Sequence, residues 1–108
     1  MRGRRFAPVI VLARILESAL AQARGDLAGA EKLLREALAL AEERQARYSA
    51  GRVHLALADV AQGRGDRAAI TSHLADAHAR FVATGAPAWA RRAEDAARVA
   101  GVTLPAPA

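Results

Sequence analysis

Residues 21–40 read AQARGDLAGAEKLLREALAL and residues 61–80 read AQGRGDRAAITSHLADAHAR, so the two stretches lie forty positions apart and share nine of twenty residues. A chain this rich in alanine and arginine would match by chance at roughly two or three positions, so the match indicates an internal repeat. The strongest part is Ala-Gln-x-Arg-Gly-Asp, which occurs at 21–26 and again at 61–66. This period of forty residues predicts how the whole chain is organised.

The repeated hexads are typical of turns between helices. Gly25 and Gly65 can adopt the left-handed conformation that ends a helix. Asp26 and Asp66 can cap the free amides of the helix that follows, and their charge favours its positive N-terminus. Each repeat is therefore expected to be a helical hairpin with these four residues at its structural turn.

Composition predicts the same class of fold. The 108 residues are 53% hydrophobic and 25% charged, which is enough apolar material for one folded domain. Thirty alanines stand against four aromatic residues, a mixture that favours helix and would fill a strand-built core poorly. The absence of cysteine excludes disulfides, thiolate catalysis and zinc–thiolate sites. We therefore predict an all-α protein.

Apolar residues at steps of three and four predict five helices. The first is expected to open at Pro8 and run to about residue 24, and the second to run from Leu27 through Ala41. The period places the next break between residues 44 and 51, and the third helix then ends at Gln62. The fourth is expected to end near residues 84–85, and the fifth to run from Pro87 to Gly101. The expected organisation is a basic arm at 1–7, a helical repeat domain at 8–101 and a loose Pro/Ala tail at 102–108.

The helical hairpins resemble a tetratricopeptide repeat array. In the second helix of each repeat, the family's two small positions correspond to Ala30 and Ala37 and to Ile70 and Ala77, and its large apolar position corresponds to Leu34 and Leu74. In the first helix, the family's small position corresponds to Ser18 and Ala58. The spacing of forty and the ending at residues 81–93 resemble the C-terminal repeats of large bacterial regulators, such as LuxR-type proteins with ATPase modules and some adenylate cyclases. This resemblance implies two and a half repeats that form a scaffold for protein–protein interaction in bacterial regulation or signalling.

Stacked hairpins leave a groove lined by the first helix of each repeat. Its mixed apolar and polar lining suits a protein or peptide segment better than a bare anion. The resemblance implies that the groove is lined by Leu12, Ile15, Ala19, Gln22, Ala23, Arg52, Leu55, Asp59, Gln62, Arg92, Asp95 and Val99.

The first helix is apolar around most of its circumference, which is typical of a helix covered on both sides. One explanation is self-association as a homodimer, and the other is that the chain belongs to a longer repeat array whose preceding repeats cover this helix. We favour the homodimer. The residues expected to mediate it are Val9, Ile10, Val11, Leu12 and Leu16.

Charge gives an alternative function. The net charge is +5, but Arg2, Arg4 and Arg5 account for most of the excess. A nucleic-acid-contacting domain would use this arm together with the arginines of the fifth helix, Arg91, Arg92 and Arg98. The apolar stretch near the N-terminus is interrupted at Arg14 and Glu17, so neither an export signal nor a membrane span is expected, and the chain is expected to be cytoplasmic.

No enzymatic site, cofactor or metal site is expected. His73 and His78 are five residues apart, about 140° around a helix, and cannot share one ion in the manner of an i, i+4 pair. His54, the third histidine, is expected to be an ordinary surface or groove residue. Adjacent carboxylates at 42–43 and 94–95 point in different directions on a helix, and no glycine-rich phosphate loop is present.

Overall fold

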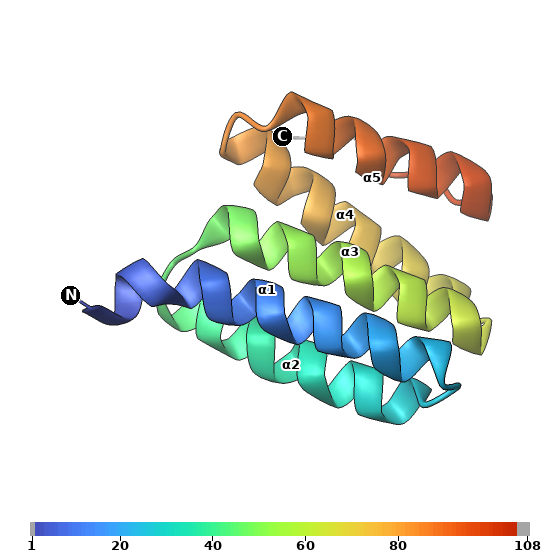
Figure 1. Cartoon of the computed structure of the whole chain (residues 1–108). Coiled ribbons are helices and arrows are strands. Elements are labelled where there is room, and N and C mark those ends of the chain that lie inside the picture. Colours follow the sequence, from blue (N-terminus) through green and yellow to red (C-terminus); the bar gives the residue numbers. More distant parts are fainter. Residues whose placement is uncertain (1, 106–108) are drawn as a thin grey trace.

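The computed structural model describes residues 2–105, and this part of the chain is all-α (Figure 1). It contains five helices and no strand: α1 (Arg2–Ala23), α2 (Leu27–Glu43), α3 (Arg47–Arg64), α4 (Arg67–Ala83) and α5 (Pro87–Ala100). The predicted fold class and number of helices are thereby confirmed.

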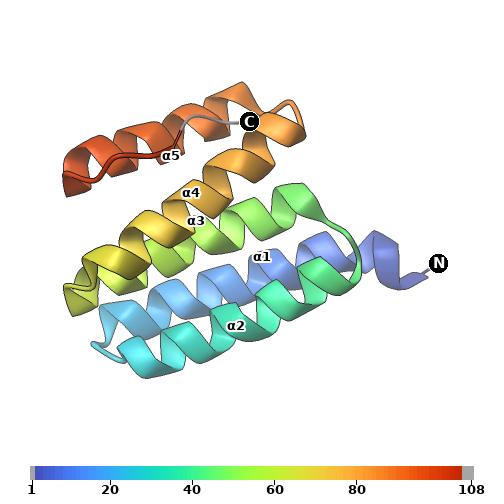
Figure 2. The same ribbon diagram turned by 180° about the vertical axis from the view of Figure 1, so that it is seen from behind.

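The helices run up and down as antiparallel hairpins in an open array. Each helix packs against the next along the chain, and α1 also contacts α3. Figures 1 and 2 show α1 and α3 in one layer and α2 and α4 in the other, with α5 at the far end of the array. The molecule measures 41 × 36 × 19 Å, and the shortest dimension corresponds to two helix layers. The array does not close on itself, because α5 packs on α4 at the end opposite α1.

The turns recur every twenty residues, twice as often as the predicted repeat. Gly25, Gln45, Gly65 and Gly85 adopt left-handed backbone conformations with φ of 81°, 55°, 70° and 68°. At each turn the amide of the next residue donates to the carbonyl five positions back, over 2.8–3.0 Å. The repeating unit is thus one helix and one turn. The break predicted between residues 44 and 51 is confirmed and falls at residues 44–46, where Gln45 takes the place of a glycine.

The predicted caps are present at both Gly-Asp turns. The Asp26 carboxylate accepts a 2.8 Å hydrogen bond from the Gly29 amide, and the Asp66 carboxylate accepts one of 3.1 Å from the Ala69 amide. These bonds satisfy amides that the first turn of a helix leaves free. Ala46 and Ala86 occupy the same place before α3 and α5 without a side-chain cap.

Both ends of the domain differ from the prediction. α1 begins at Arg2, so residues 2–7 continue the helix and Pro8 lies inside it. Ala7, four residues before Val11, is buried like it. At the other end, Val102 and Leu104 pack against the core instead of forming part of a loose tail. Residues 106–108 of the expected tail lie outside the described residues.

The core follows the hairpins. The largest cluster joins α1, α2 and α3 around Leu34, Val53 and Leu57. A second joins α3, α4 and α5 around Leu74, and a third surrounds Phe81 between α4 and α5. Buried positions recur twenty residues apart in these clusters, and alanine occupies most of them: Ala37, Leu57, Ala77 and Ala97, and Ala30, Ala50, Ile70 and Ala90.

Candidate interaction surface

The side of α1 that faces away from the core is apolar along its length. At about 100° per residue, Val9, Leu12, Leu16 and Leu20 fall within roughly 80° of one another, opposite the buried Val11. Their exposed fractions are 64%, 37%, 58% and 59%. Including the exposed alanines between them, we define the outer face of α1 as Val9, Leu12, Ala13, Leu16, Ala19, Leu20 and Ala23.

Four of the five residues predicted to mediate self-association are exposed, and the fifth is buried in the core. Val9, Leu12 and Leu16 belong to the outer face, and Ile10 is 42% exposed beside it. Val11 is 1% exposed because it packs between α2 and α3, so the prediction of an intermolecular role for Val11 was wrong. Leu20 was not predicted, although it lies four residues beyond Leu16 on the same face.

A hollow of about 210 Å³ separates α1 from the start of α3. It brings together three predicted groove residues, namely Leu12 and Ile15 from α1 and Arg52 from α3. Tyr48 and Ser49 complete the α3 wall and were not predicted. Leu12 belongs to both the hollow and the outer face, which makes the two surfaces continuous.

Trp89 lies between the arginines of two helices. The Arg52 guanidinium of α3 is 4.7 Å from the centre of the Trp89 ring, and that of Arg92 on α5 is 4.5 Å away. The ring also packs on Phe81 and Tyr48, with centroids 5.6 and 5.9 Å apart. This cluster joins α3, α4 and α5, and it brings the predicted groove residues Arg52 and Arg92 to one aromatic ring.

The remaining predicted groove residues are distributed over α1, α3 and α5, and their surroundings differ. Leu55 is half-buried and packs on the core clusters of α4 and α5. Asp95 pairs with Arg98 on its own helix, at 2.7 Å. Asp59 is exposed, but neighbouring protein partly desolvates its carboxyl and raises its pKa. Gln22 is half-buried on α1. Ala19, Gln62 and Val99 are exposed on α1, α3 and α5.

Two histidines meet across α3 and α4, which the sequence analysis did not foresee. The Nδ1 atoms of His54 and His73 are 3.1 Å apart, and the Asp76 carboxylate lies 3.9 Å from Nδ1 of His54. Burial lowers the pKa of His54 to about 4 and also lowers that of His73, so both rings are uncharged at neutral pH. The prediction considered only pairs within one helix, whereas the contact joins residues from two.

The arginines of the alternative function are partly engaged within the chain. Arg98 is paired with Asp95, and Arg92 stacks on Trp89. Arg91 is exposed on α5. The side chains of Arg2, Arg4 and Arg5 lie outside the part of the chain whose side chains are described.

The fold and this surface define an all-α array of antiparallel helices with an apolar outer helix. Comparison of the chain with protein-family models, curated proteins and solved structures finds no match. Within residues 2–105, no helix combines the length and the apolar character that crossing a membrane requires.

Proposed function

We propose that this chain is a non-catalytic protein-interaction module of the tetratricopeptide-repeat type that self-associates through the outer face of α1. The observation that carries the proposal is the row of exposed apolar side chains from Val9 to Leu20. α1 contains five large apolar residues that are exposed: Val9, Ile10, Leu12, Leu16 and Leu20.

The shape of this face suits another helix. It follows i, i+3, i+7 and i+11 spacing and extends over about 21 Å from Val9 to Ala23. Such spacing is typical of an amphipathic helix that packs into an apolar partner surface. Two copies of α1 related by a twofold axis would present the same row to each other, as an isologous dimer requires.

Charge does not oppose that approach. The outer face of α1 carries no charged side chain between Val9 and Ala23. The two charged residues of α1 between Val9 and Ala23, Arg14 and Glu17, neutralise each other through a 2.7 Å ion pair. A second copy therefore removes apolar surface from water without bringing uncompensated like charges together.

The open arrangement of hairpins supports the tetratricopeptide-type assignment. In such arrays each hairpin contacts only its neighbours, and the exposed flank serves for partner binding. The hollow between α1 and α3 continues the apolar outer face and offers a recess of about 210 Å³ to a partner side chain.

The test is the molar mass of the wild-type chain and of Leu16→Glu by light scattering at micromolar concentration. We expect the mass of two chains for the wild type and of one chain for the variant, because a buried carboxylate disfavours association. Val99→Glu is the matched control, since Val99 is 79% exposed on α5. It should remain dimeric, and circular dichroism should show that both variants are folded.

Two outcomes contradict the proposal. One is a wild-type mass of one chain throughout the concentration range, and the other is a dimer that Leu16→Glu leaves intact. Salt separates the proposal from the nucleic-acid alternative: apolar self-association should change little between low and moderate salt, whereas binding of duplex DNA through phosphates should weaken steeply. Tight DNA binding at physiological salt, abolished by removal of residues 1–5, would favour the alternative.

A further inference from the structure

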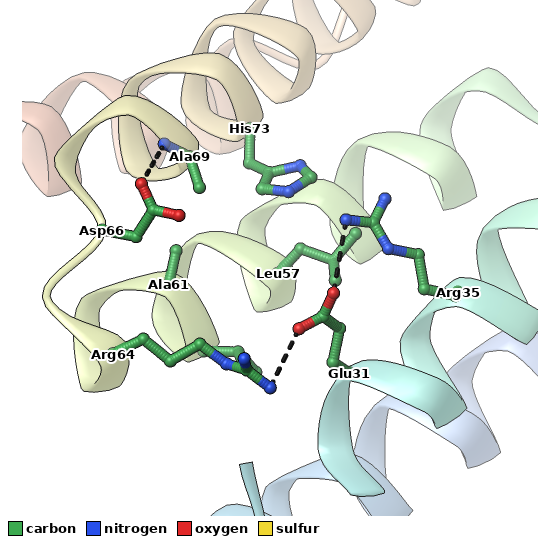
Figure 3. Close-up of a pocket in the computed structure, with 9 residues that line it drawn as sticks. Glu31, Arg35, Leu57, Ala61, Arg64, Asp66, Ala69 and His73 are labelled. Carbon is green, nitrogen blue, oxygen red and sulfur yellow. Dashed lines mark hydrogen bonds and ion pairs between the residues drawn. The ribbon is translucent and has the colours of Figure 1, made fainter. Parts of the chain in front are cut away.

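The histidine pair between α3 and α4 has the composition of a metal site. His54 extends from α3, and His73 and Asp76 lie one turn apart on α4. One ligand atom from each of the three residues lies within 4.8 Å of the others. His73 also lines a hollow of about 190 Å³ between α2, α3 and α4, into which its ring extends (Figure 3).

Packing does not account for His54. It stands twenty residues after Leu34 and twenty before Leu74, which are 0% and 1% exposed at the equivalent positions of their helices. Leucine thus occupies this place in α2 and α4, the two helices that flank α3, while the end helices have Arg14 and Glu94 there. His54 is itself only 5% exposed, and its Nε2 atom has no hydrogen-bond partner among the described residues. An unsatisfied buried polar atom costs folding free energy, so stability does not explain why a histidine occupies this position.

The ligand types and distances fit a first-row transition metal. Zinc is held by imidazole nitrogens and carboxylate oxygens at about 2.0–2.2 Å, which separates neighbouring ligand atoms of a tetrahedral site by roughly 3.4 Å. The two Nδ1 atoms are already 3.1 Å apart. Asp76 is half-exposed, so rotation of its side chain can shorten the 3.9 Å that separate it from His54.

We propose that His54, His73 and Asp76 form a binding site for a divalent transition-metal ion such as Zn²⁺. With three protein ligands, the fourth position stays open to water, as in sites that bind or activate a small ligand. This proposal is independent of self-association, because all three ligands come from one chain.

The charges around the site are compatible with a cation. Arg80 is a competing positive charge, since its guanidinium lies 3.9 Å from the Asp76 carboxylate, but it is also held by Glu42 at 3.0 Å and by the backbone carbonyl of Asp76 at 3.2 Å. In the adjoining hollow, Glu31 pairs with Arg64 at 3.1 Å and with Arg35 at 3.5 Å (Figure 3). Asp66 lines the same hollow and caps α4. Binding through Asp76 therefore leaves Arg80 paired with Glu42.

The full chain is first stripped of metal with a chelator and is then titrated with Zn²⁺ at neutral pH, with binding measured by calorimetry. We expect one saturable site per chain and a melting temperature that rises with Zn²⁺. Co²⁺ should bind at the same site and give the visible absorption of a low-coordinate complex, which reports ligand geometry independently of affinity.

Variants identify the ligands. His54→Leu restores the residue found at positions 34 and 74 and should fold, yet it should weaken Zn²⁺ binding about tenfold or more, as should His73→Ala. His78→Gln is the matched control, because His78 faces Glu94 of α5 at 2.8 Å and takes no part in the site. Absence of saturable binding by the wild-type chain would overturn the proposal. So would equal affinities for His54→Leu and the wild type, or loss of the Co²⁺ spectrum in His78→Gln alone.

Discussion

Gly51 of α3 lies against the aromatic ring of Phe81 on α4: a Cβ atom placed on Gly51 would come within 2.7 Å of Cε1 of the ring. Phe81 is 0% exposed, and Tyr48 and Trp89 pack around it. The missing side chain thus lets α3 approach α4 closely enough to bury the largest residue of the core.

Gly51→Ala should therefore destabilise the chain, although alanine is the better helix former. Relief of the clash requires Phe81 to move in a packed core, which costs about 1–3 kcal/mol, while helix propensity returns about 1 kcal/mol. We expect a net loss of about 1 kcal/mol, measured by chemical denaturation. Gly63→Ala, near the end of the same helix, meets only the flexible tip of Leu27 at 3.3 Å and should be neutral or stabilising. Equal stabilisation by both substitutions would contradict this account.

Gln45→Gly should stabilise the chain. Gln45 is the non-glycine residue with positive φ, at 55°, among residues 2–105, and a side chain in this conformation costs about 1 kcal/mol. Glycine should recover roughly 0.5–1 kcal/mol in the free energy of unfolding, less the entropy it adds to the unfolded chain. The reverse change, Gly65→Gln, should destabilise by a similar amount, since Gly65 occupies the same conformation at φ of 70°. Effects of the same sign at both turns would exclude this explanation.

Trp89→Ala should loosen α5. Trp89 packs on Tyr48 and Phe81 and lies between Arg52 and Arg92, so its removal deprives the last helix of its main aromatic contact. We expect a loss of about 2–3 kcal/mol in the free energy of unfolding, measured by circular dichroism during urea denaturation. Trp89→Phe keeps a ring at the site and should lose less than half as much. If alanine and phenylalanine were equally destabilising, ring packing would not be the cause.

Stability should fall in mild acid because of His54. Its folded pKa of about 4 lies below the ordinary 6.5, so the unfolded chain binds a proton more readily than the folded chain does. The contribution of the neutral ring is complete above about pH 6.5 and is lost as the pH falls toward 4, by up to roughly 3 kcal/mol. The shift of His73 acts in the same direction. The charged groups that face the pair are Asp76, Arg80, Glu42, Arg35, Glu31 and Asp66.

The check is the midpoint of urea denaturation between pH 7 and pH 4 with a chelator present. His54→Leu removes the titrating ring while the carboxylates remain. The midpoint of this variant should therefore fall much less between pH 7 and pH 5 than that of the wild type. A decline of the same size in both proteins would assign the effect to the carboxylates instead.

Local patterns in the sequence predicted the helices well. The Gly-Asp pairs at 25–26 and 65–66 mark turns because left-handed glycine and a capping carboxylate act within a few residues. The turn at Gln45 could be placed only by the period, since glutamine carries no such preference. Pro8 suggested a helix start, whereas α1 begins six residues earlier, at Arg2.

Contacts between helices limited what could be predicted of the site. α1 has apolar residues on two opposite faces, and the sequence does not indicate which face packs against the core. Val11 was therefore assigned to the exposed surface. His54 and His73 are nineteen residues apart and meet because α3 and α4 pack antiparallel in one particular register. Periodicity within one helix carries no information on that register, so the pair could not be found from spacing alone.

The turns that return every twenty residues make the length of this molecule adjustable. Because most packing is between neighbouring helices, a duplicated pair of helices could be inserted at the Gly85 corner, between α4 and α5, and leave the contacts among α1 to α4 in place. Growth by whole hairpins would move the apolar outer helix and the histidine cluster farther from the last helix while leaving each intact, so spacing between sites could change in fixed steps during evolution or by design.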